Sequence, residues 1–259
     1  MVTRWLGISL FIASVAAAQS GMPSVSQPPP VSAGALMIKA MQYYNIGAYS
    51  LALRAFQQAA EIGNVEAMMY LGVMYGTAQG TQADYKQSYD WFLKAANAGD
   101  TQAMNNIGLL YYQGLGQPKD YHQAMTWYRK AADFGNSEAL FNIGVLYRDG
   151  LGVSANPRDA MRFFRKAADA GDPLASNEVG VLYQKGQGVD EADYAEAMVW
   201  YQKSADAGNA VAMCNIGQLY EDGLGVAKNR DEAIAWYHRA AVAGNAEAKN
   251  RLKSLGVEE

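Results

Sequence analysis

A Gly followed by Asn or Asp recurs along this chain at an almost constant interval. The six pairs begin at Gly63, Gly99, Gly135, Gly171, Gly208 and Gly244. The intervals are 36, 36, 36, 37 and 36 residues. Such a period indicates a solenoid, because each unit is one supersecondary element that can bury its apolar side only against its neighbours. We therefore expect an array of stacked units, and not a globule built around one central core.

The first half of each unit has the pattern of one helix face. In the second unit Ala103, Ile107, Gly108 and Tyr111 stand at relative positions zero, four, five and eight, and the other units repeat these residue types. These positions share a face of an α-helix. A Gly within a helix costs ~1 kcal/mol relative to Ala. We therefore predict that the backbone of another helix closely approaches this Gly.

The second half of each unit has an aromatic pair followed three residues later by two small residues, as in Trp127-Tyr128 and Ala131-Ala132. Large rings facing small residues are typical of interdigitating helices. We predict that these rings lie in the core, and that a stacking role toward a sugar or cofactor is the weaker alternative.

Most units join their two helices by a Gly-x-Gly turn, as in Gly114-Leu115-Gly116. The Asn or Asp that follows the closing Gly is predicted to cap the next helix.

This pattern resembles the Sel1-like (Sel-one-like) repeat family, which is related to the tetratricopeptide repeat. The resemblance rests on Ala103 to Tyr111, the Gly114-Leu115-Gly116 turn, Trp127 to Ala132 and Gly135-Asn136, and on their recurrence in every unit. It implies an all-α fold: a right-handed α-α superhelical solenoid of stacked helix-turn-helix repeats, with the first helix of each repeat on the concave side. Five such repeats are expected at 65–100, 101–136, 137–172, 173–209 and 210–245. Residues 34–64 look like a tetratricopeptide-like first repeat, and 246–259 like a capping helix and tail with a charged outer face.

The first 18 residues have the layout of a secretory signal peptide. Arg4 precedes an apolar run, and Ala16 and Ala18 form a cleavage-site pattern. The apolar run is shorter than the ~20 residues that span a bilayer, although an uncleaved anchor is the alternative. Residues 19–33 are rich in Pro and Ser and read as a linker. We expect a periplasmic or secreted protein of the bacterial envelope that contacts a membrane, if at all, only through an uncleaved signal.

Composition argues against several classes of function. The net charge is -4 and basic residues are not clustered, so nucleic acid is not an expected partner. The single Cys214 and the distant His122 and His238 predict neither a disulfide nor a metal site. No catalytic signature such as Ser-x-x-Lys or Gly-x-Ser-x-Gly occurs. We predict a protein that is not an enzyme and has no cofactor.

The resemblance implies a monomeric adaptor that binds a protein or peptide in its concave groove, regulating an envelope enzyme, sensor or assembly complex. Two alternatives stay open. One is a cell-envelope hydrolase or β-lactam-binding enzyme like cysteine-rich relatives of the family, although this chain lacks their cysteines. The other is a secreted virulence or host-interaction factor.

Positions of the first helices that fall outside the packing face are the candidate partner-binding residues. They are Met69, Asn105, Asn106, Leu109, Tyr112, Phe141, Asn142, Val145, Arg148, Asn177, Val181, Gln184, Asn215, Gln218 and Glu221. An Asn series could hydrogen-bond the backbone of an extended peptide, and a scaffold role for the same residues is the favoured alternative. Phe141 and Arg148 are typical of interface anchors. Cys214 is expected to be exposed and chemically inert.

Overall fold

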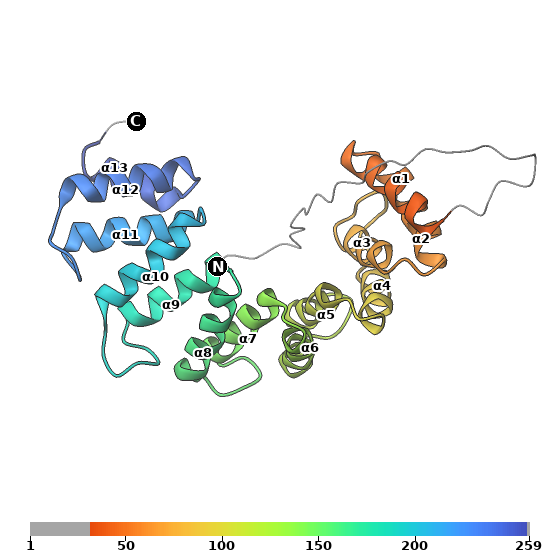
Figure 1. Cartoon of the computed structure of the whole chain (residues 1–259), viewed down its shortest axis with the longest axis horizontal. Helices are drawn as coiled ribbons and strands as arrows, with labels where there is room; N and C mark the ends of the chain where they lie inside the picture. The colour runs from red at the N-terminus through yellow and green to blue at the C-terminus, as the bar shows by residue number, and fades with distance from the viewer. Residues whose placement is uncertain (1–31, 258–259) are drawn as a thin grey trace, which may run out of the picture. The chain divides into compact units, whose positions relative to one another are not determined.

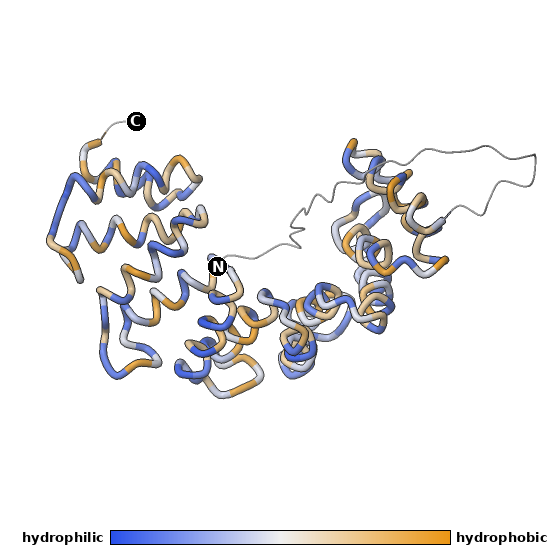
Figure 2. The backbone as a smooth tube through the Cα atoms, in the orientation of Figure 1, coloured by the Kyte–Doolittle hydropathy of each residue, from blue (hydrophilic) through white to orange (hydrophobic). Residues whose placement is uncertain are grey.

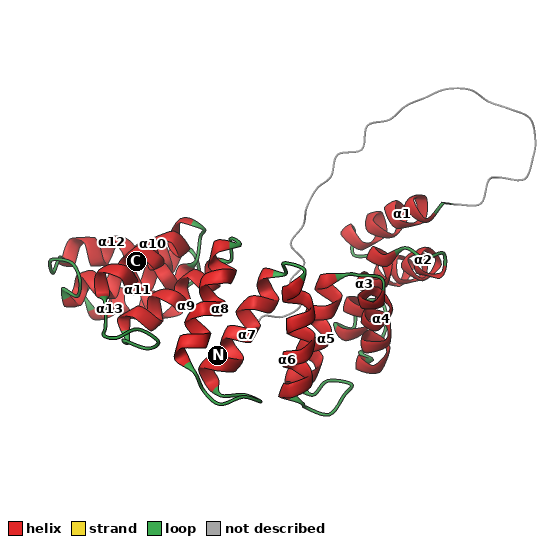
Figure 3. Cartoon of the chain, turned by 60° about the horizontal axis from the view of Figure 1, so that its bottom comes forward, coloured by secondary structure: helices red, strands yellow, loops and turns green. Residues whose placement is uncertain are grey.

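The computed structural model describes residues 32–257, which form thirteen α-helices (Figure 1). No strand occurs within this range (Figure 3). The predicted all-α repeat solenoid is confirmed. The predicted signal peptide, and the predicted linker as far as residue 31, lie outside the described residues. From residue 32 to residue 257, no helix is both long and apolar enough to cross a bilayer.

The helices are close to uniform in length. Their bounds are α1 Ala33–Asn45, α2 Tyr49–Glu61, α3 Val65–Gly76, α4 Tyr85–Asn97, α5 Thr101–Gln113, α6 Tyr121–Asp133, α7 Ser137–Asp149, α8 Pro157–Asp169, α9 Pro173–Gln184, α10 Tyr194–Asp206, α11 Ala210–Asp222, α12 Arg230–Val242 and α13 Ala246–Ser254. We call α3, α5, α7, α9, α11 and α13 the A helices, and α4, α6, α8, α10 and α12 the B helices.

The chain divides into two compact units, of which the first ends at Lys119 and the second begins at Asp120. In the first unit, α1 pairs with α2 and α3 with α4, and α5 packs on α4. In the second unit, α7, α9 and α11 each pair with the B helix that follows, and each A helix from α7 to α13 also packs on the B helix before it. Hydrophobic and hydrophilic stretches alternate along the helices of both units (Figure 2).

Each A helix begins at the predicted cap. The side chains of Asn64, Asp100, Asn136, Asp172, Asn209 and Asn245 accept hydrogen bonds from backbone N–H groups in the first turn of the helix. The glycine before each cap has a positive φ, as at Gly99 with 94°. This backbone conformation ends the preceding B helix and returns the chain into the next A helix.

The Gly that recurs in the A helices packs against a ring. Beside Gly72, Gly144, Gly180 and Gly217, the atoms nearest to an added Cβ belong to an aromatic ring of the paired B helix. The predicted close approach of another helix occurs, but the nearest atoms are those of a ring, and at Gly180 the backbone oxygen of Ala197 on α10 follows at 3.2 Å. The absent side chain leaves room for a ring, which buries more apolar area than a backbone contact would.

The B-helix aromatic pairs divide into a buried ring and a half-buried ring. The second members, Phe92, Tyr128, Phe164, Tyr201 and Tyr237, are at most 1% exposed. The first members are half-buried and carry a cation three residues later, as with Lys130 Nζ 4.1 Å from the centre of the Trp127 ring. The prediction of a core position is thus confirmed for the second ring. The first rings at Trp91, Trp200 and Trp236 also pack against buried clusters, while their outer parts face solvent beside a hydrated cation.

Candidate partner-binding surface

In the first unit, the predicted positions lie on α3 and α5 and are less accessible than expected. Asn105 and Asn106 are only 3% and 4% exposed. Met69, Leu109 and Tyr112 are half-buried. Met69 packs against the buried cluster around Phe56, and α5 as a whole packs on α4.

In the second unit, the predicted apolar positions contribute to packing. The centres of the Phe141 and Phe164 rings are 5.5 Å apart. Phe141 and Val145 both pack against the buried cluster around Phe164, and Val181 packs against the cluster around Tyr237. Phe141 is half-buried, so part of its ring helps to close the seam between repeats, and its role as an interface anchor stays a prediction. Asn142 is half-buried on the same helix.

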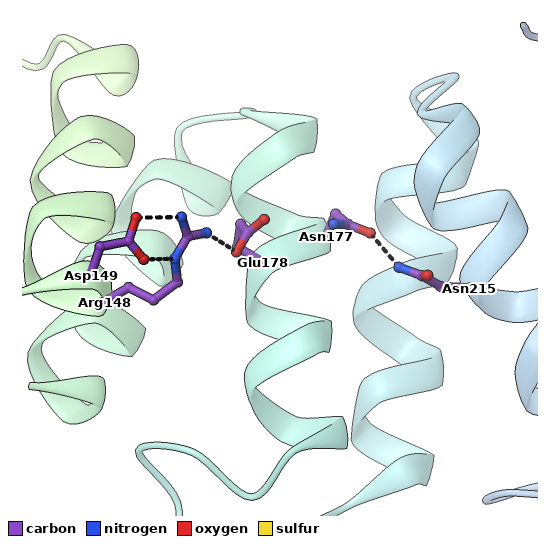
Figure 4. Close-up of polar contacts among 5 residues, drawn as sticks. All are labelled: Arg148, Asp149, Asn177, Glu178 and Asn215. Atoms are coloured by element: carbon purple, nitrogen blue, oxygen red, sulfur yellow. Dashed lines mark hydrogen bonds and ion pairs between the residues drawn. The ribbon is translucent and has the colours of Figure 1, made fainter. Parts of the chain in front are cut away.

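Arg148 joins two A helices through its guanidinium group. Its Nε and Nη2 donate to the two carboxylate oxygens of Asp149 at 2.7 and 2.9 Å, and its Nη1 donates to Glu178 Oε2 on α9 at 2.6 Å (Figure 4). The hydrogen bonds to Asp149, with the nearby Glu178 charge, raise the pKa of Arg148 further above its ordinary value. Arg148 thus stays charged and holds α7 against α9.

Two asparagines form the next link. Asn215 Nδ2 on α11 donates to Asn177 Oδ1 on α9 at 3.0 Å (Figure 4). Asn177 is 7% exposed, while Asn215 is half-buried. The bond therefore pairs two different positions of successive repeats, which a ladder of Asn at one repeated position would not predict.

The last link joins α11 to α13. Gln218 Nε2 donates to Glu247 Oε1 at 3.0 Å. Arg251 on α13 lies 3.6 Å from Glu221 Oε2 and 3.7 Å from Glu247 Oε1. The predicted residues Gln218 and Glu221 therefore lie beside charged residues of the terminal helix.

The polar residues that follow the A-helix tyrosines also contact the buried rings. Tyr201 donates its hydroxyl hydrogen to Gln184 Oε1, and Tyr237 donates to Glu221 Oε2, both at 2.5 Å. Burial raises the pKa of both tyrosines, and the nearby Glu178 raises that of Tyr201 further. Gln184 and Glu221 thus have a structural role, because each accepts a hydrogen bond from a buried tyrosine.

Glu178, Glu247 and Arg251 belong to this surface but were not among the predicted residues. Glu178 interrupts the Asn series of the A helices, and this interruption was the signal that could have identified it. The two residues of α13 were assigned only a capping role. Their contacts depend on which residues of neighbouring helices come together, and the repeat period does not determine that.

Cys214 occupies the A-helix position of Asn105 and Asn177, but its expected exposure is wrong. The residue is 1% exposed, and burial raises the pKa of its thiol to about 11. Within residues 32–257, no three His, Cys, Asp or Glu side chains gather as a metal site would need. The groups on this surface are suited to hydrogen bonding and ion pairing.

Comparisons with known proteins agree with the geometry. The sequence profile of the Sel1 repeat matches residues 65–100, 101–136, 137–172, 173–209 and 210–245. Comparison with curated proteins finds no match.

Three solved structures illustrate the similarity. A Sel1 repeat protein from Oxalobacter formigenes is 33% identical with a TM-score of 0.79, over 85% of this chain and 89% of that one. The protein c5321, a protective antigen present in uropathogenic Escherichia coli strains, is 33% identical with a TM-score of 0.73, over 86% of this chain and 48% of that one. Immunity protein Pa5087 from Pseudomonas aeruginosa shares the fold at 20% identity with a TM-score of 0.55, over 84% of each chain.

A scaffold of such repeats is consistent with protein–protein interaction. The matched repeats cover more than half of the sequence, and their helix pairs occur in the structure at the matched positions. The chain belongs to the Sel1 repeat family.

Proposed function

We propose that this chain is an exported, non-enzymatic adaptor that holds a segment of a protein partner in a groove along its A helices. By holding that partner, it regulates an envelope enzyme, sensor or assembly complex. The observation that carries the proposal is the row of side-chain bonds from α7 to α9, α11 and α13. Predicted positions from three successive repeats thereby take part in one row of polar side chains.

The chemistry of this row suits the backbone of an extended peptide. Asn and Gln each offer both a donor and an acceptor, so they can pair with a peptide group in either orientation. Asn177, Asn215 and Gln218 bring three such side chains to neighbouring helices. The contacts between repeats also hold these amide groups in one orientation. Binding a peptide would therefore cost less side-chain conformational entropy.

Site-specific photocrosslinking in the producing cell tests where a partner binds. A photoreactive amino acid replaces Val145 or Val181 on A helices, and Val199 or Val242 on B helices serves as the matched control. The two B-helix valines are the more accessible, with 62% and 90% of their surface exposed. We expect the same discrete protein to crosslink from both A-helix positions and from neither control.

Binding by the purified partner is the decisive step. The crosslinked protein is identified, expressed separately and titrated against the full chain, with Asn215→Ala as the weakened variant. Crosslinking from the B-helix valines alone, or binding unchanged by Asn215→Ala, would contradict the proposed surface.

Export and the lack of catalysis need separate measurements. Cell fractionation and the mass of the isolated chain test export, and recovery of the chain in the cytosol with its first 18 residues intact contradicts it. Incubation with a chromogenic β-lactam and with peptidoglycan tests for an enzyme. We expect no turnover, whereas turnover that a single substitution on this surface abolishes would refute the adaptor.

A further inference from the structure

Two arginines of the second unit are each held between two carboxylates. Arg148 lies between Asp149 and Glu178, and bridges α7 to α9. Arg251 lies between Glu221 and Glu247, and bridges α11 to α13. We call these two groups the Arg148 triad and the Arg251 triad.

Each triad contains two carboxylates but only one guanidinium group. One guanidinium balances one carboxylate, so each triad carries a formal charge of -1. All six side chains reach solvent, and the carboxylates range from 21% exposed at Glu178 to 60% at Glu247. In each triad the two carboxylates share one arginine. A further cation can therefore pair with one of these two carboxylates.

The amide pair Asn177–Asn215 joins α9 to α11, and each of these helices also carries one carboxylate of a triad, Glu178 on α9 and Glu221 on α11. Asn177 is only 7% exposed. Within residues 32–257, its Nδ2 group donates no hydrogen bond to another side chain or to the backbone. Asn215 Oδ1 likewise accepts none in that range. One donor and one acceptor thus remain for the two polar atoms of a peptide group.

The charge of the A helices differs from that of the neighbouring B helices. The A helices α7, α9, α11 and α13 together carry four Lys or Arg against six Asp or Glu. The B helices α6, α8, α10 and α12 carry nine Lys or Arg against seven Asp or Glu. An approaching cationic segment is therefore attracted to the A-helix side of the unit.

We infer that the partner segment is a basic extended peptide whose backbone pairs with Asn177 and Asn215, and whose Lys or Arg side chains pair with the two triads. The inference rests on the proposed function and specifies the partner's chemistry. It commits to a cationic protein segment, because an acidic segment would meet an unbalanced carboxylate at both ends of the surface.

Selection from a phage-displayed library of random dodecapeptides on the immobilised full chain tests this assignment. We expect the enriched peptides to carry an excess of Lys and Arg. Synthetic copies should bind about tenfold or more weakly to a Glu178→Gln, Glu221→Gln double variant, measured by fluorescence anisotropy. Their affinity for the unaltered chain should also fall as salt concentration rises.

The control variant removes the same number of negative charges, but from positions that lie outside the proposed binding surface. Glu196 on α10 and Glu232 on α12 are both exposed, and Glu196→Gln with Glu232→Gln should leave affinity unchanged. In the test variant, Gln keeps an acceptor oxygen for Arg148 and for the Tyr237 hydroxyl, and thermal unfolding followed by circular dichroism verifies that it folds.

The outcomes separate the two proposals. Enrichment of neutral or acidic peptides, or of basic peptides that bind the double variant as tightly as the unaltered chain, overturns this inference and leaves the adaptor standing. If no peptide is enriched, peptide binding itself fails, and the proposed function fails with it.

Discussion

Gly144 on α7 lies directly against the ring of Phe164 on α8. A Cβ added to Gly144 would stand 2.6 Å from two carbons of that ring, closer than carbon atoms approach without strain. The cost of Gly in a helix, ~1 kcal/mol, is smaller than the gain from fully burying a phenyl ring, ~1.5–3 kcal/mol. The same relationship at Gly72, Gly180 and Gly217 explains why the repeat retains an unfavourable helix residue.

Replacing Gly144 by Ala should destabilise the chain although Ala favours helices. The added methyl group must displace the Phe164 ring, and overpacking of this kind costs about 1–3 kcal/mol. Urea unfolding followed by circular dichroism measures the change.

Gly34 provides the control for helix propensity. It lies in α1, and nothing stands within 4 Å of an added Cβ. Gly34→Ala should therefore be neutral or slightly stabilising. Equal effects at Gly34 and Gly144 would show that the ring contact does not determine the cost.

Much of this fold could be predicted from the sequence because each element depends on nearby residues. The Asn and Asp caps and the Gly turns act within a few positions, so their spacing alone fixes where helices begin and end. The partner of Gly144 is instead a residue of another helix. A period identifies a face of a helix, but it does not say whether a backbone or a ring will fill the space beside it.

Two adjacent phenylalanines in α8 differ in how deeply they are buried, so the same substitution at each shows the effect of burial alone. Phe164 is 0% exposed, whereas Phe163 is half-buried and stacks on Tyr147 with ring centres 5.6 Å apart. Phe164→Ala should cost about 3–5 kcal/mol, because it leaves a cavity in the core. Phe163→Ala should cost clearly less, since solvent already reaches that ring. Unfolding free energies of the two variants decide, and equal losses would contradict the division into inner and outer rings.

The thiol of Cys214 should react slowly in the folded chain. The thiolate is the reactive form, and burial raises the pKa of this thiol to about 11, so very little is ionised near neutral pH. We expect Ellman's reagent to modify it only after urea is added. A Cys214→Ser, Ser254→Cys variant, with its thiol on the exposed end of α13, should react at once. Rapid modification of native Cys214 would restore the exposure predicted from the helical spacing.

The candidate site was less predictable than the fold. Spacing selected Arg148, Asn177, Asn215 and Glu221, which do form a row of contacts, while binding of a partner there stays a prediction. It did not show that these residues bind one another, because that depends on the offset between neighbouring repeats. The side chain of Glu178, which breaks the pattern, is the one that pairs with Arg148.

The hydroxyl of Tyr201 should make stability depend on pH in the alkaline range. Burial raises its pKa, and the negative charge of Glu178 raises it further, whereas an unfolded Tyr ionises near about 10. Above that pH the folded chain binds more protons than the unfolded chain, so the contribution of Tyr201 is complete below pH ~10 and is lost as pH rises from there through the folded pKa. Tyr201→Phe removes the titrating group. It also removes the hydrogen bond to Gln184, worth about 0.5–1.5 kcal/mol, so the variant should be less stable by a constant amount below that pH. Urea midpoints measured over a series of pH values should therefore converge above pH ~10, and parallel curves would show that Tyr201 ionises normally.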